Sequence, residues 1–121
     1  MKSMVIGFVA AAVLAVGVVG GVKAGSAGGA TAKVTVVAGG TSDVYTVTFI
    51  GGQRAEVAIV GDGDTDLDLY VYDENGNLIA SSDGPSDREA VSWTPRWTGK
   101  FKIKVVNRSR LMANRYAIAC N

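Results

Sequence analysis

The residues from 61 to 78 constrain the fold more than any other part of this chain. The segment begins as an acidic loop spaced by glycines, and then aliphatic residues alternate with polar or aromatic ones. Leu67, Leu69 and Val71 fall on one side of this alternation, and Tyr70 and Tyr72 fall on the other. A period of two is that of a β-strand with one buried face. We therefore expect a strand here whose aliphatic side chains point into a core and whose phenols point outward.

The strand is followed by a turn and by further runs of the same kind. Asn75 and Gly76 tolerate positive φ, so residues 73–77 predict a hairpin that returns through residues 78–82. Short alternating segments, separated by Gly, Pro and Asn, predict strands within residues 34–37, 44–50, 55–60, 89–94, 100–105 and 116–119. No segment after residue 24 has a helical period. The sequence therefore predicts an all-β fold, an antiparallel β-sandwich of seven to eight strands.

The N-terminal residues 1–24 have the features of a secretory signal peptide. Lys2 gives a positive start, residues 5–22 are apolar or glycine, and small residues follow at the end of the segment. The alternative is an uncleaved membrane anchor, because the apolar run approaches the roughly 20 residues that a span needs. We predict cleavage after Ala24, with Ala30-Thr31-Ala32 as the alternative site. We further predict a flexible Gly/Ala-rich leader at residues 25–42, a sandwich domain at 43–121, and a location outside the cell, in the periplasm or in the cell envelope.

Composition argues against catalysis. The chain has no His and a single Cys, Cys120, so it lacks the commonest general base and cannot form an internal disulfide. It also has no nucleophile elbow and no phosphate-binding loop. We therefore expect that the protein is not an enzyme. Cys120 is interpreted as a small buried hydrophobic residue, the alternative being a free thiol or one that pairs between molecules.

Charge is unevenly distributed along the chain. Nine acidic residues lie between positions 62 and 89, with Arg88 as the one base among them, and seven bases and no acid follow Glu89. Lys100, Lys102 and Lys104 share one face of a predicted strand, which indicates a basic surface for an anionic polymer or an acidic partner. The alternative is a solvated face that pairs across strands with the acidic segment. We expect no nucleic-acid partner, because the predicted mature chain has no net positive charge.

Alternating acids in the loop before the central strand suggest a calcium site. Asp62, Asp64 and Asp66 are two residues apart, and Ca²⁺ takes several carboxylate or carbonyl oxygens as ligands. The spacing does not match an EF-hand. The alternative is a solvated loop without an ion, because exposed like charges 4 Å apart repel by only about 1 kcal/mol in water. Asp66 and Asp68 would then accept backbone hydrogen bonds or pair with Arg88.

The aromatic residues divide into expected core and expected surface. Outward phenols of Tyr70 and Tyr72 would form a platform for sugars or peptide chains, unless a neighbouring strand or loop caps them. Trp93 is expected in the core. Trp97 lies in a turn after Pro95 and is expected to be partly exposed.

Several of these segments together resemble a known family. The sequence Asp-Thr-Asp-Leu-Asp-Leu-Tyr-Val-Tyr-Asp at 64–73, then Asn75-Gly76, Glu89, Gly-Lys-Phe-Lys-Ile-Lys-Val at 99–105 and Tyr116 are similar to the bacterial pre-peptidase C-terminal domain. The resemblance covers about residues 43–120, with Phe101 where Tyr is usual. It implies a jelly-roll-like β-sandwich without catalytic activity that accompanies secreted peptidases or other exoenzymes. Similar modules include the collagen-binding domains of secreted bacterial collagenases, some of which bind calcium.

We therefore predict a secreted, non-catalytic module that adheres to an extracellular polysaccharide or protein fibre. Its contacts would come from Tyr70, Tyr72, Lys100, Lys102 and Lys104. The alternative is a calcium-stabilised structural or maturation module that assists an exported peptidase or other exoenzyme. A membrane would be a partner only if the signal segment is uncleaved.

Overall fold

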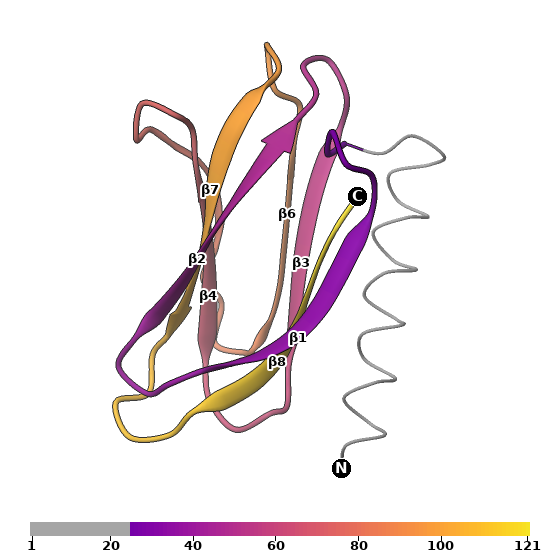
Figure 1. The fold of residues 1–121 in the computed structure, drawn as a ribbon. Coiled ribbons are helices and arrows are strands. Elements are labelled where there is room, and N and C mark those ends of the chain that lie inside the picture. The colour runs from indigo at the N-terminus through magenta and orange to yellow at the C-terminus, as the bar shows by residue number, and fades with distance from the viewer. Residues whose placement is uncertain (1–24) are drawn as a thin grey trace.

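The computed structural model describes residues 25–121, so the predicted signal peptide at 1–24 lies outside the described residues. These residues form eight strands and no helix (Figure 1). The strands are β1 (Thr31–Val37), β2 (Ser42–Phe49), β3 (Ala55–Gly61), β4 (Leu67–Tyr72), β5 (Leu78–Ser82), β6 (Arg88–Trp93), β7 (Gly99–Asn107) and β8 (Asn114–Cys120). All paired strands are antiparallel, which confirms the predicted fold class.

The strands are divided between two four-stranded sheets that face each other. Sheet A has the order β2-β7-β4-β5, and sheet B has the order β1-β8-β3-β6. The chain crosses between the sheets several times, and this places β4 and β7 in the interior of sheet A and β3 and β8 in the interior of sheet B (Figure 1). Each sheet therefore contributes one face to a shared core.

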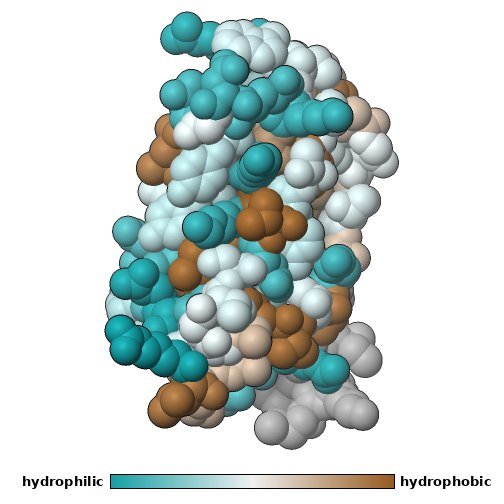
Figure 2. Space-filling model, turned by 60° about the vertical axis from the view of Figure 1, so that its left-hand side comes forward, coloured by the Kyte–Doolittle hydropathy of each residue, from teal (hydrophilic) through white to brown (hydrophobic). Residues whose placement is uncertain are grey.

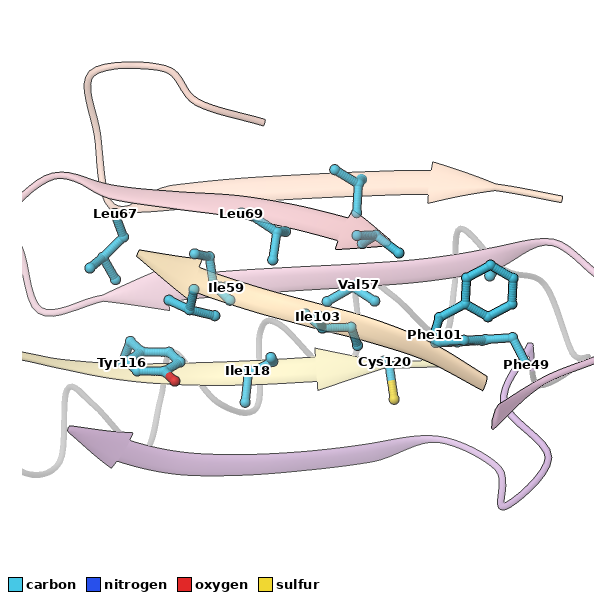
Figure 3. Packing of buried hydrophobic residues seen from close by; sticks show 14 of the residues in the cluster. Phe49, Val57, Ile59, Leu67, Leu69, Phe101, Ile103, Tyr116, Ile118 and Cys120 are labelled. Carbon is cyan, nitrogen blue, oxygen red and sulfur yellow. The ribbon is translucent and has the colours of Figure 1, made fainter. Parts of the chain in front are cut away.

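The core consists of the inward side chains of both sheets. Leu67, Leu69 and Val71 of β4 are fully buried, which confirms the direction predicted from their alternation. In sheet B, Val57 and Ile59 of β3 are buried in the same cluster (Figure 3). Because side chains alternate between the two faces of a strand, Tyr70 and Tyr72 of β4 lie on the outer face of sheet A.

Three aromatic rings close one end of the core. Phe49 and Trp93 are 4.9 Å apart between ring centroids, Trp93 and Phe101 are 5.5 Å apart, and Phe49 and Phe101 are 5.9 Å apart. The two contacts of Phe49 are edge-to-face, an arrangement that favours aromatic packing beyond the area buried. Trp93, which the sequence places in the core, is half-buried and packs against the core through these ring contacts.

The β4–β5 hairpin forms where the sequence predicts it. Asp73 Oδ1 accepts hydrogen bonds from the backbone N–H groups of Asn75 and Asn77, both at 2.9 Å. Gly76 has a φ of 81°, a conformation that a residue with a side chain rarely adopts. The turn is thus fixed by a carboxylate cap and a glycine.

The predicted flexible leader at 25–42 is wrong for much of its length. Strand β1 begins at Thr31, which is paired with Cys120 of β8, and Ser26 is 3% exposed. The Ser26 hydroxyl donates to the carbonyl of Asn121 at 2.9 Å. The sandwich therefore includes residues ahead of the predicted boundary at 43, because strand β8 supplies the partner that these residues need.

The single cysteine lies inside the sandwich. Cys120 is 7% exposed, unpaired and part of the core cluster, in agreement with its interpretation as a small buried residue. Its sulfur lies 3.1 Å from the hydroxyl of Thr31. Across residues 25–121, no helix is long and apolar enough to cross a membrane.

Candidate functional site

The outer face of sheet A brings the predicted tyrosines and lysines together. Tyr70 is opposite Lys104 in the β4–β7 register, and Tyr72 is opposite Lys102. Side chains directly opposite one another on a sheet have Cβ atoms about 4.5–5.5 Å apart. Each tyrosine ring therefore lies beside the aliphatic part of a lysine side chain. Both tyrosines are half-buried, and Lys102 is exposed. Lys100 continues the lysine row toward the first residue of β7.

The residues of β2 that lie opposite the three lysines are uncharged. On β2, Val44, Thr46 and Thr48 are opposite Lys104, Lys102 and Lys100, respectively. No register partner of these lysines on β2 or β4 is acidic, and the acidic segment contacts the row at its end, where Glu74 accepts the backbone N–H of Lys100 at 2.9 Å. Figure 2 turns this side of the molecule forward and shows mostly hydrophilic and intermediate residues with scattered hydrophobic ones.

Asp68 anchors Tyr70 from the same face of β4. The Tyr70 hydroxyl donates to Asp68 Oδ2 at 3.3 Å, and Arg108 Nε lies 3.5 Å from the same oxygen. Burial raises the pKa of Asp68, with a further contribution from the charge of Asp66. Burial, followed by the charge of Asp68, also raises the pKa of Tyr70. Arg108, which lies beside Asp68, belongs to the β7–β8 loop, whereas the sequence suggested Arg88 as a partner of this carboxylate.

The predicted calcium ligands are not assembled into one site. Asp62 accepts backbone N–H groups with both oxygens, from Asp64 at 3.2 Å and from Arg115 at 3.2 Å. The pKa of Asp66 is raised by burial and then by the charge of Glu89. Within residues 25–121, no three His, Cys, Asp or Glu side chains are grouped so that they could hold a metal. Calcium binding at these residues stays a prediction.

The hydroxyl groups of Tyr45 on β2 and Tyr116 on β8 form a hydrogen bond between the two sheets, which the sequence did not indicate. Tyr116, fully buried on β8, donates its hydroxyl to Asp43 Oδ2 at 2.6 Å, and the Tyr45 hydroxyl is 2.6 Å from the same oxygen of Tyr116. Lys33 Nζ lies 4.9 Å from the centroid of the Tyr45 ring. Burial, and then the bond to Asp43, raises the pKa of Tyr116. Tyr116 stood out in the sequence only through the family resemblance, since its partners are some 70 residues away.

The protein is thus a small β-sandwich whose sheet A carries a strip of tyrosines and lysines on its outer face. The family model of the bacterial pre-peptidase C-terminal domain matches residues 41–107, and the chain belongs to this family.

Three solved structures illustrate the proteins that share this fold. The periplasmic inhibitor of g-type lysozyme PliG from Aeromonas hydrophila is 20% identical, with 76% of this chain and 84% of that chain covered and a TM-score of 0.64. The pre-peptidase C-terminal domain of a Bacillus anthracis collagenase is 17% identical, with coverages of 75% and 88% and a TM-score of 0.59. The Yersinia pseudotuberculosis-derived mitogen is 12% identical, with coverages of 76% and 84% and a TM-score of 0.56. At these identities the likeness shows the fold alone. No curated protein sequence matches the chain.

Proposed function

We propose that this protein is an exported, non-catalytic binding module that adheres to an extracellular polysaccharide or protein fibre through the outer face of sheet A. The observation that carries the proposal is the direct cross-strand pairing of Tyr70 with Lys104 and of Tyr72 with Lys102. Both strands are interior to the sheet, so the four side chains project from a rigid platform.

The geometry of this face suits a polymer. Side chains on one face of a strand recur every second residue, about 6.6–6.8 Å apart, so the face offers a row of repeated contacts along β4 and β7. Each contact combines an apolar ring or alkyl stem with a polar tip. An extended chain of repeating units can occupy such a row, and its anionic groups would gain from the lysines.

The chemistry of the face favours binding over catalysis. Phenols and ammonium groups on an open sheet supply contact area and charge, whereas catalysis by a nucleophile needs a base and an orienting group within hydrogen-bond reach. Asp68, the carboxylate nearest Tyr70, is buried and occupied by the phenol and by Arg108. The similar PliG structures belong, by their names, to inhibitors of a lysozyme, which supports a protein as one kind of partner.

Retention on insoluble polymers tests this proposal. The purified protein would be mixed with acidic polysaccharide, neutral polysaccharide and collagen-like fibre, and the bound fraction would be measured over a salt series. We expect Tyr70→Ala to weaken retention about tenfold, equivalent to about 1.4 kcal/mol, and Lys102→Ala to weaken it most at low salt. Leu111→Ala, at a 95% exposed residue of the β7–β8 loop, is the control. Retention that is unchanged in both face variants would refute the proposal.

A second candidate is a calcium-stabilised structural or maturation module for an exported peptidase or other exoenzyme. The observation in its favour is a pair of buried carboxylate oxygens, Asp66 Oδ1 and Asp68 Oδ1, that accept no hydrogen bond. Thermal unfolding with calcium and with a chelator tests it. An ion at a hundredfold excess over its dissociation constant stabilises a protein by about 2.7 kcal/mol, so equal melting temperatures would eliminate this candidate.

A further inference from the structure

Trp97 is an exposed aromatic residue on a turn that the rest of the fold holds in place. It is 60% exposed and lies between β6 and β7. The carbonyl of Pro95 accepts the N–H of Gly52 at 2.8 Å, and the Thr98 hydroxyl accepts the N–H of Gly51 at 2.9 Å. A Cβ added to Gly51 would lie 2.6 Å from the backbone of Trp97. The β2–β3 turn therefore packs directly beneath the backbone that presents this indole.

The indole is also supported from the β4–β5 hairpin. Glu74 Oε1 accepts the backbone N–H of Lys100 at 2.9 Å, which ties the hairpin to the start of β7. A Cβ added to Gly99 would be 3.5 Å from both Cδ1 and Nε1 of Trp97, so the ring edge rests on this glycine. An exposed ring with support on two sides loses little conformational freedom when a ligand contacts it.

A groove of about 350 Å³ opens on one side of this ring. Trp97 forms a wall, Trp93 and Phe101 belong to the aromatic core beneath, and Ile79, 41% exposed, contributes from β5. A second, smaller hollow of about 70 Å³ is lined by Trp97, Gly99 and the turn that begins at Asp73. The groove lies at the low end of the size range of small-molecule sites.

The charged residues around the larger groove balance. Asp73 and Arg96 line it, so its rim carries one acid and one base, whereas the smaller hollow is lined by two acids, Asp73 and Glu74, and one base, Lys100. A balanced rim does not select a charged ligand, but it offers both donors and acceptors of hydrogen bonds. This distinguishes the groove from the lysine row of sheet A, where no register partner is acidic.

We propose that the groove binds a neutral saccharide, with a sugar ring stacked on the indole of Trp97 and its hydroxyl groups directed to the polar rim. A sugar ring has an apolar C–H face and polar edges, and this division matches an aromatic wall with donors and acceptors around it. A purely apolar ligand would leave the rim charges facing it without partners, which is unfavourable. This site goes beyond the polymer-binding face, because none of its contacts depends on Tyr70 or Tyr72.

The test is an NMR titration of the purified protein with cellotetraose and, separately, chitotetraose. The chain has two tryptophans, so two indole N–H signals are expected, and Trp97→Phe assigns the signal of Trp97. We expect a saturable shift of the Trp97 signal at millimolar sugar, with a much smaller shift for Trp93. Trp97→Ala should weaken binding at least tenfold, whereas the exposed-site control Leu111→Ala should not change it.

Three outcomes would overturn the assignment. These are no saturable shift with either sugar, equal binding by Trp97→Ala, and saturation by a proline-rich peptide in place of the sugars. Trp97→Ala should keep the wild-type melting temperature within a few degrees because the side chain is largely exposed, so loss of binding cannot be attributed to unfolding. Tyr70→Ala should leave the sugar titration unchanged, and this separates failure of this site from failure of the polymer-binding face.

Discussion

Replacement of Tyr116 by Phe is the most direct probe of how the two sheets are joined beside β1 and β2. The substitution keeps the buried ring and removes one hydroxyl, which donates to Asp43 and is bonded to Tyr45, both at 2.6 Å. A hydrogen bond to a charged group contributes about 1.5–3 kcal/mol, and one between neutral groups about 0.5–1.5 kcal/mol. Asp43 and Tyr45 are only half-buried, so water can replace part of what is lost. We therefore expect the free energy of unfolding to fall by about 2 kcal/mol, the sum of the lower limits of the two ranges.

Urea unfolding followed by tryptophan fluorescence measures this cost, because Trp93 packs against the core. The slope of free energy against urea should stay constant, so the change will be in the midpoint. Tyr45→Phe is the matched control. It removes only the hydrogen bond between Tyr45 and Tyr116 and should lower the free energy of unfolding by about 0.5–1.5 kcal/mol. In the Tyr116→Phe background the same change should cost almost nothing, since its partner is already absent. A Tyr116→Phe protein within about 0.5 kcal/mol of wild type would show that the network contributes nothing to stability.

Three further predictions concern the core, an ionisable group and a glycine. Leu69→Ala should destabilise the fold by about 2–5 kcal/mol in the same urea assay, because it empties a fully buried site between the sheets; a cost below about 0.5 kcal/mol would contradict the packing. Because burial raises the pKa of Asp66, its protonated form is favoured in the native state, and wild-type stability should fall as pH rises through that raised pKa. Asp66→Asn should therefore melt higher than wild type at pH 7, with a difference that disappears below the ordinary carboxyl pKa of about 3.9; a lower melting temperature at pH 7 would refute this. Gly61→Ala should cost about 1–3 kcal/mol in thermal unfolding because its Cβ would overlap the carboxylate of Asp87, and a neutral effect would mean that Asp87 moves aside freely.

Elements with strict alternation were predictable from the sequence. The bounds expected for β4 and β5 agree with the structure, because Leu67, Leu69 and Val71 specify one buried face and Asn75-Gly76 specifies the turn. On β7, Phe101 and Ile103 point inward while Lys102 points outward, again as alternation predicts. The face that carries the tyrosines and lysines follows from the same rule once β4 and β7 are neighbours.

What could not be predicted depends on contacts between residues far apart in the sequence. The start of β1 resembles a small-residue leader, and it becomes a strand because Thr31 and Ala32 pair with Cys120 and Ala119. Asp68 is paired with Arg108, although Arg88 is closer in sequence, because β7 lies beside β4 and delivers the β7–β8 loop to that point. The groove at Trp97 has the same origin. Its walls come from β5 and from the β6–β7 turn, which local patterns do not bring together.

The segregation of charge along the chain has a structural explanation that bears on binding. Acids in residues 62–89 cap backbone groups: Asp73 closes its hairpin, Asp87 accepts the N–H of Gly63 at 2.6 Å, and Glu74 accepts the N–H of Lys100 at 2.9 Å. The lysines of β7 instead point away from the core and have no acidic register partner. The near-zero net charge therefore conceals a sheet face with a positive local potential. Because such a potential is screened within about 8–10 Å at physiological salt, the lysines should strengthen retention of anionic polymers mainly at low ionic strength, whereas the tyrosine contacts should persist at high salt.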